Sequence, residues 1–216
     1  MHRRRRTAVV VTSALLLSVP LLAACGNEAR PGAAAVVGGE RIEVGAVQSK
    51  VKAVRVAQER SPQAEQLVKD SGQLTRAKLY DLIVARVVEK AAEDAGVSVT
   101  RKEVQTGRAQ LVGQAGGEEQ LAAMYLQQRG IAPGQLEDVV RRDVLVGKLA
   151  EAIGATNGQE GQQKLNAAFS AAAATLDIDV NPRFGTWSDQ DLALGEYKAP
   201  WITQVTQSQG APVSGA

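Results

Sequence analysis

Histidine and cysteine, which often carry chemistry at neutral pH, are nearly absent from this chain. It contains one cysteine, Cys25, and one histidine, His2, which lies in a segment that we expect to be cleaved off. Without histidine or a free thiol, a protein lacks the usual general base, the common catalytic dyads and triads, and most transition-metal ligands. We therefore predict no catalytic site, no metal site and no cofactor, and we expect that the protein is not an enzyme.

Carboxylate chemistry remains as a separate hypothesis, that of a hydrolase or isomerase working with acidic residues. Asp177 and Asp179 alternate with Leu176, Ile178 and Val180, which would place both acids on one face of a strand. Such alternation is typical of a half-buried strand with a solvated edge, and we prefer that interpretation. The chain has no pattern typical of a zinc protease, an α/β-hydrolase, a nucleotide-binding loop or a calcium loop.

Cys25 follows a segment with the features of an export signal. Four arginines at positions 3–6 precede an apolar run over 8–22, which is shorter than the roughly 20 residues of a membrane span. The run ends in Leu22-Ala23-Ala24-Cys25, which resembles the bacterial lipobox. The resemblance implies that residues 1–24 are a lipoprotein signal peptide and that Cys25 is acylated. The alternative is an ordinary signal peptide with a chance cysteine.

The excess of positive charge belongs to this signal peptide. The whole chain has 25 basic and 23 acidic side chains, but removing residues 1–24 leaves 21 basic against 23 acidic, a balance of −2. This balance gives no indication of nucleic-acid binding. The remaining 192 residues suffice for one domain and a tail, and residues 25–34, rich in Gly, Ala and Pro, are expected to be a lipidated spacer.

A small hairpin and a long helix are expected next. The glycines of Ala35-Val36-Val37-Gly38-Gly39 tolerate the positive φ of a tight turn, so a β-hairpin is predicted over 35–43. Apolar residues at helical spacing predict a helix over 44–58. A polar segment follows, and within it a short helix is predicted over 64–68. Lys50, Lys52 and Arg55 are expected on the solvated face of the long helix.

Five further helices are expected, most of them with a recognisable start or stop signal. Thr75 is a predicted N-cap, and Thr100 with Glu103 forms a predicted capping box. The helices are expected from Thr75 to Gly96, from Thr100 to Gly116, around Leu121 up to Gly130, from Pro133 to Gly154, and over 162–176.

The pattern changes near the C-terminus. A period of two over 176–180 predicts a closing strand, and residues 181–185 predict a turn. Beyond Ile202 the composition predicts disorder. The expected fold is therefore mostly α, a compact multi-helix domain over 35–187 with a small β-hairpin and a closing C-terminal strand. An aromatic-containing tail would cover 188–216.

Five apolar or aromatic residues are candidates for binding a polypeptide: Met124, Tyr125, Phe184, Trp187 and Trp201. Methionine surfaces adapt to varied partners, and aromatic side chains could grip a peptide. The alternative for Met124 and Tyr125 is ordinary core packing. The alternative for the C-terminal aromatics, Tyr197 included, is that they hold the tail on the helical domain.

The order of these segments resembles the N-terminal chaperone module of SurA-like and PrsA-like extracytoplasmic folding factors. Val36-Val37-Gly38-Gly39-Glu40-Arg41-Ile42 is similar to the entry hairpin of that family, and Asp179-Val180-Asn181-Pro182-Arg183-Phe184-Gly185-Thr186-Trp187 is similar to its closing segment. The stretches from Leu82 to Val104 and from Gly130 to Leu149 resemble helices of the same module. The resemblance covers roughly residues 35–187.

The resemblance implies a chaperone-like protein that binds unfolded or partly folded exported proteins, without metal or nucleic acid. It would be lipid-anchored to the extracytoplasmic face of the cell membrane through Cys25. Many relatives carry a parvulin prolyl-isomerase domain, but only about ten residues separate the two last predicted helices, so isomerase activity is not expected. The alternative is a non-catalytic interaction lipoprotein with one dedicated protein partner.

Overall fold

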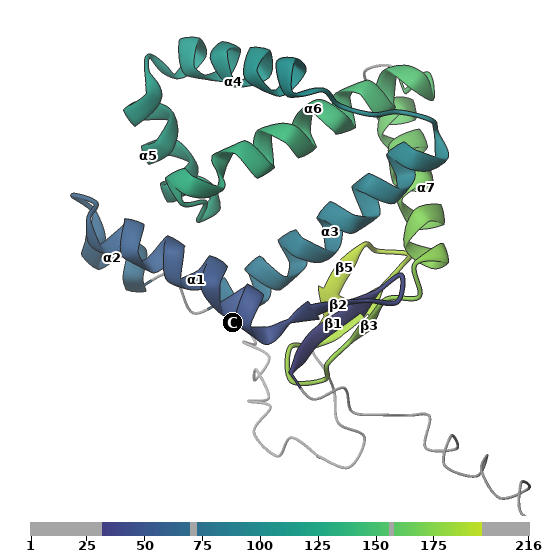
Figure 1. Ribbon diagram of the computed structural model, residues 1–216, viewed down its shortest axis with the longest axis horizontal. Helices are drawn as coiled ribbons and strands as arrows, with labels where there is room; N and C mark the ends of the chain where they lie inside the picture. Colours follow the sequence, from purple (N-terminus) through teal and green to yellow (C-terminus); the bar gives the residue numbers. More distant parts are fainter. Residues whose placement is uncertain (1–31, 70–72, 156–157, 196–216) are drawn as a thin grey trace, which may run out of the picture. The chain divides into compact units, whose positions relative to one another are not determined.

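Seven α-helices and two small antiparallel sheets make up the part of the chain that the structure describes (Figure 1). The structure is a computed structural model that describes residues 32–69, 73–155 and 158–195. The helices are α1 (Val44–Glu59), α2 (Ala64–Lys69), α3 (Leu74–Asp94), α4 (Arg101–Ala115), α5 (Glu118–Arg129), α6 (Leu136–Ala152) and α7 (Gln159–Thr175), and a 3-10 turn, η2 (Pro133–Gln135), precedes α6. The predicted mostly helical fold is confirmed. Within these ranges, no helix is both long and apolar enough to cross a membrane.

The N-terminal hairpin forms as the glycine pair predicts. β1 (Ala33–Val37) pairs antiparallel with β2 (Glu40–Glu43), and Gly38 and Gly39 connect them with φ of 60° and 79°. Positive φ at both central residues is typical of a type I′ turn, whose twist matches that of the strands. A Cβ on Gly38 would lie 2.9 Å from Leu176 Cδ2, so this glycine also lets the turn approach the end of α7.

The closing strand is shorter than the period-two pattern predicts. β3 (Asp179–Val180) pairs with β1 and completes a three-stranded sheet in the order β2-β1-β3. Leu176 instead ends α7, where its carbonyl accepts a hydrogen bond from the amide of Gly38, and Asp177 has a φ of 44°. A left-handed residue interrupts extended backbone, so the strand begins only after Asp177.

A second hairpin, which the sequence analysis did not predict, follows the turn over 181–185. β4 (Thr186–Ser188) pairs antiparallel with β5 (Ala193–Gly195), and Trp187 lies opposite Leu194. Arg76 of α3 donates a hydrogen bond of 3.0 Å to the Leu194 carbonyl. Regular structure therefore continues beyond residue 187, where we placed the end of the domain. The rest of the predicted tail, residues 196–216, lies outside the described residues.

α3 is central because its residues belong to several apolar clusters. Leu79 and Ile83 are fully buried in a cluster with the hairpin and α1. Val87 packs in a second cluster with Leu149 of α6 and Ala173 of α7. Figure 1 accordingly shows α3 between the strands on one side and α6 on the other. This helix therefore holds the N-terminal and C-terminal parts of the domain together.

The start of α3 corrects one prediction. The N-cap is Gln73, without a side-chain cap, and the helix begins at Leu74, so Thr75 lies inside it. Leu74 is itself buried in the cluster with the hairpin and α1, so packing rather than capping sets this start. The predicted stop is confirmed, because Gly96 has a left-handed φ of 67° just beyond the helix.

The capping box at the start of α4 is confirmed. The Glu103 amide donates a hydrogen bond of 3.3 Å to Thr100 Oγ1, and the Thr100 amide donates one of 2.7 Å to Glu103 Oε2. Left-handed Gly116 and Gly130 end α4 and α5, as their positions predict. These local signals turn the chain twice, so that α6 returns alongside α4 and α3.

Candidate polypeptide-binding site

A hollow of about 240 Å³ lies between α1, α3 and α6. Side chains three and four positions apart share one face of a helix, so α3 and α6 each present a single stripe to it. From α3 the stripe is Lys78, Asp81, Leu82, Ala85, Val88 and Glu89; from η2 and α6 it is Gln135, Asp138, Val139, Arg141, Arg142 and Leu145.

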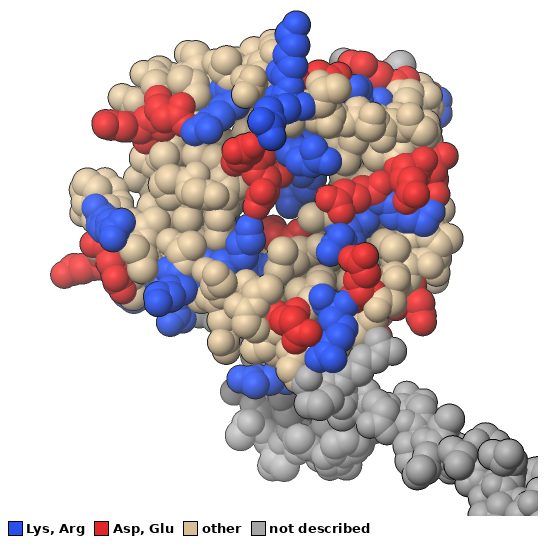
Figure 2. Space-filling model, in the orientation of Figure 1, with Lys and Arg blue, Asp and Glu red and all other residues tan. Residues whose placement is uncertain are grey.

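The hollow combines an apolar lining with charged side chains. Val88, Val139 and Leu145 are buried, whereas Glu89 and Arg141 are exposed. Because buried and exposed residues line the same hollow, it opens to the surface. Basic and acidic side chains are interspersed over the face in view in Figure 2, with no single sign of charge dominating it. Such a site can accept apolar side chains while polar groups of the ligand stay close to water.

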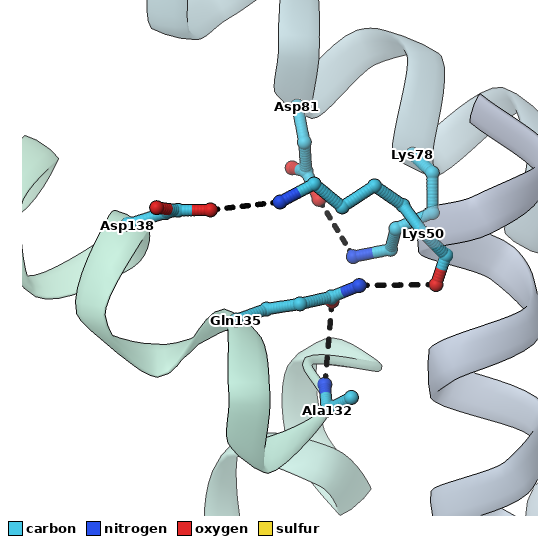
Figure 3. A network of polar contacts seen from close by, with 6 residues as sticks. All are labelled: Lys50, Lys78, Asp81, Ala132, Gln135 and Asp138. Carbon is cyan, nitrogen blue, oxygen red and sulfur yellow. Dashed lines mark hydrogen bonds and ion pairs between the residues drawn. The ribbon is translucent and has the colours of Figure 1, made fainter. Parts of the chain in front are cut away.

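A polar network crosses one end of the hollow (Figure 3). Lys50 Nζ of α1 lies 2.7 Å from Asp138 Oδ2 of α6. Gln135 donates from Nε2 to the Lys50 carbonyl at 3.0 Å, and its Oε1 accepts from the amide of Ala132 at 3.4 Å. Both the Nε2 donor and the Oε1 acceptor of the buried Gln135 side chain are therefore hydrogen-bonded, and the bond to Lys50 holds the start of α6 against α1. Lys50, which we expected on a solvated face, is a contact between helices.

Lys78 is the most buried charged residue on this wall. Its side chain is only 4% exposed, and Nζ lies 2.7 Å from Asp81 Oδ2, one helical turn away, on a side chain that is 38% exposed. An ammonium in an apolar wall needs a partner, since desolvating an unpaired charge costs several kcal/mol. Asp81 is that partner, and its more exposed side chain keeps the carboxylate in contact with water.

A second groove, of about 340 Å³, lies between α3, α7 and the β4–β5 hairpin. Tyr80, Phe169, Trp187 and Leu192 contribute its apolar lining. The rings of Tyr80 and Trp187 are tilted by 36° with centroids 6.1 Å apart, and Trp187 Nε1 donates a hydrogen bond of 2.8 Å to Asp189. The Trp187 ring is therefore held in place at this groove, and it does not line the hollow between α1, α3 and α6.

The four described residues among the five predicted to bind a polypeptide fall into two groups rather than one site. Tyr125 is buried in a cluster with Leu121 of α5, and Met124 packs against that cluster while remaining partly exposed. Phe184 is buried in the cluster of the N-terminal hairpin, and Trp187 packs against that cluster while it also lines the second groove. Trp201 lies outside the described residues. None of the four described candidates lines the hollow between α1, α3 and α6.

Other sequence expectations are also placed by the structure. Asp177 and Asp179 are both exposed, as expected of a solvated edge. Arg183 lies over the Phe184 ring, with 5.6 Å from its guanidinium carbon to the ring centroid.

The hollow itself was not predicted from the sequence, although one signal was present: Lys78 falls in the apolar stripe of α3, between positions that pack inward. A charged residue at such a position indicates a site where an apolar face meets solvent.

A separate network fixes α4 against α6. Lys148 Nζ donates to Glu103 Oε1 at 2.6 Å and to the Ser98 carbonyl at 2.7 Å. The hydrogen bond from Lys148, followed by those from the Thr100 backbone and hydroxyl, lowers the pKa of Glu103 from 4.5 to about 2. The carboxylate is therefore ionised throughout the neutral range, and it joins the capping box to α6.

In the described part of the chain, no group of three or more His, Cys, Asp or Glu side chains is placed to hold a metal ion.

Comparison with known proteins gives the family of the chain. Residues 1–150 match the SurA-like N-terminal domain family, which covers the hairpin, α1 to α5 and most of α6. The match suggests chaperone-like binding and identifies no catalytic domain. Comparisons with curated proteins and with solved structures found no match. Since the family match covers more than half of the chain, this protein belongs to the SurA-like N-terminal domain family.

Proposed function

We propose that this protein is a non-catalytic, chaperone-like lipoprotein that binds unfolded exported polypeptides in the hollow between α1, α3 and α6. The family match supports chaperone-like binding, and the observation that carries the choice of site is the open, apolar-lined hollow. Binding of many clients requires an accessible apolar surface rather than reactive groups. The stripes of α3 and α6 offer such a surface, with charges at its edge that keep it soluble when it is empty.

The size of the hollow sets the strength of binding that we expect. Burying one Val- or Leu-sized side chain contributes about 1.5–3 kcal/mol, while immobilising each side chain costs about 0.5–1.5 kcal/mol. A hollow of about 240 Å³ holds one or two such side chains. The dissociation constant for a single segment should therefore be about micromolar or weaker. Weak binding of this kind allows a client to be released and to fold.

We further propose that the protein acts at the extracytoplasmic face of the cell membrane, anchored by a lipid on Cys25. The basic and apolar segments before Leu22-Ala23-Ala24-Cys25 support this proposal. Each buried CH₂ of an acyl chain contributes about 0.8 kcal/mol, so two or three chains hold a protein firmly at a membrane. Tethering would raise the concentration of the hollow near exported chains as they emerge.

The five candidate residues from the sequence have different places in this proposal. Met124 and Trp187 are partly exposed, so they could contact a client without a change of fold. Tyr125 and Phe184 are buried, so they would contact a client only after their clusters rearranged. Trp201 stays a candidate outside the described residues. We therefore place the main contact in the hollow and treat Met124 and Trp187 as additional contacts.

An aggregation assay with a matched pair of variants tests the proposed function. Ala85 faces the hollow and Ala77 is an exposed residue of the same helix that does not line it. The mature chain, with Cys25→Ser to remove lipid and thiol chemistry, should slow aggregation of several unrelated unfolded proteins at an equimolar ratio. Ala85→Phe, which fills the hollow, should abolish most of this effect, and Ala77→Phe should not.

Two results would contradict this proposal. No effect on any client would exclude a general chaperone, and one strong partner in a pull-down would then favour the dedicated-partner alternative. Equal activity of Ala85→Phe and Ala77→Phe would show that clients bind elsewhere on the protein.

A further inference from the structure

The Lys78 ammonium has donor capacity that the described residues do not use. An ammonium carries three N–H donors. The structure gives Lys78 one acceptor, Asp81 Oδ2, among the described residues. The side chain is only 4% exposed and lines the hollow, so we expect the remaining donors to be reached from there. A buried donor without a partner costs free energy, and an acceptor brought by a ligand would recover it.

The charges around the hollow also favour an acidic ligand. Its lining holds four basic side chains, Lys50, Lys78, Arg141 and Arg142, against three acidic ones. Each of those acids already has a cation nearby: Asp81 has Lys78 and Asp138 has Lys50. Glu89 shares Arg86, at 3.7 Å, with Glu40, which lies closer to that guanidinium at 2.9 Å. Among the basic residues, Arg142 lies 3.9 Å from Asp143, whereas Arg141 is exposed and has no ion pair among the described residues. The lining itself therefore carries one basic side chain more than it has acidic ones, and Arg141 is its one basic side chain without an ion pair among the described residues.

We infer that the hollow selects polypeptide segments in which a carboxylate lies beside apolar side chains. The carboxylate accepts from the Lys78 ammonium, and the neighbouring side chains pack against Leu82, Val88 and Leu145. This inference rests on the proposed function and names the class of client segment. The carboxylate comes either from an Asp or Glu side chain or from the C-terminus of a chain, because both present the same acceptor.

Fluorescent peptides of about ten residues separate these cases in a binding titration with the mature Cys25→Ser chain. The first peptide has one Glu between Leu and Val residues and blocked ends, and the second has Gln in its place. The third is the Gln peptide with a free C-terminal carboxylate next to an apolar residue, and the fourth has Lys at the central position. We expect the Glu peptide to bind about tenfold more tightly than the Gln peptide, and the Lys peptide to bind most weakly. A gain from the free C-terminus alone would assign the site to chain ends.

Variants of the chain then locate the preference. Lys78→Met keeps the length and apolar stem of the side chain, and Arg141→Gln changes an exposed residue whose loss does not threaten the fold. Each should reduce the tenfold ratio between carboxylate and neutral peptides. Arg55→Gln, at an exposed position of α1 outside the hollow, should leave the ratio unchanged.

The outcomes separate this inference from the proposed function. Equal affinity for the Glu, Gln and free-carboxylate peptides, or a ratio that survives both Lys78→Met and Arg141→Gln, overturns the carboxylate preference alone. Tighter binding of the Lys peptide also overturns it. Absence of binding by every peptide overturns both the preference and the proposed site.

Discussion

Removing Asp81 should destabilise the protein more than removing its partner Lys78. In Asp81→Ala, the Lys78 ammonium stays in an apolar wall with its only described acceptor gone. In Lys78→Met, the remaining Asp81 carboxylate is 38% exposed and recovers hydration from water. The two halves of one ion pair should therefore give unequal losses of stability, in a direction set by which charge is buried.

The burial of each partner sets the magnitude. Breaking a fully buried pair by removing one partner costs about 3–5 kcal/mol, and an exposed pair is worth about 0–1 kcal/mol. Because only the lysine is buried, we expect Asp81→Ala to lower the free energy of unfolding by about 2 kcal/mol. That loss corresponds to a fall in Tm of about 4–8 °C in a domain of this size. Lys78→Met should lower the free energy of unfolding by about 1 kcal/mol or less.

Urea denaturation followed by circular dichroism measures these differences in the mature Cys25→Ser chain. Glu89→Ala is the matched control, since Glu89 pairs with Arg86 at the same spacing on the same helix but both side chains are about half exposed. We expect the control to change the free energy of unfolding by no more than about 0.5 kcal/mol. The reasoning is refuted if Lys78→Met costs more than Asp81→Ala, or if Asp81→Ala costs no more than the control.

Three further predictions concern other parts of the chain. The folded-state pKa of Glu103 lies at about 2, below its ordinary 4.5, so its contribution to stability is present above pH 4.5 and is lost as the pH falls toward 2. Glu103→Gln should therefore flatten this part of the stability–pH curve measured by thermal melting. An unchanged slope would contradict the assignment. Gly38→Ala should lower Tm more than Gly39→Ala, because both have positive φ but only a Cβ on Gly38 meets Leu176, whereas Gly39 has open space. Cys25→Ala should abolish incorporation of labelled palmitate and release the protein from membranes, and a variant that remains membrane-bound and labelled would exclude Cys25 as the anchor.

Local signals were sufficient to predict much of the fold. The Gly38-Gly39 turn and the capping box of Thr100 and Glu103 depend on residues within a few positions of one another, and both were confirmed. The start of α3 was not, because the burial of Leu74 depends on residues distant in sequence. The β4–β5 hairpin was missed because strands of three residues are too short to show a period.

The hollow could not be predicted because it depends on how helices are placed together. Ala85 of α3 and Leu145 of α6 are each ordinary members of an apolar stripe, and only their juxtaposition creates an open site. Aromatic and methionine content instead pointed to Tyr125 and Phe184, which the structure buries in separate clusters. Residue type alone therefore did not separate a binding surface from core packing. Lys78 carried the more specific information, since it is charged at a position whose helical neighbours pack inward.

Site-specific photocrosslinking tests the central claim most directly, because it asks where an unfolded client lies on the protein. A benzophenone amino acid replaces Ala85 in the hollow or Ala77 on the exposed side of the same helix, and the two variants are irradiated with an unfolded client. Crosslinks from position 85 that disappear when excess apolar peptide is added, with few from position 77, are the predicted result. Equal crosslinking from both positions, or none from position 85, would contradict binding in the hollow between α1, α3 and α6.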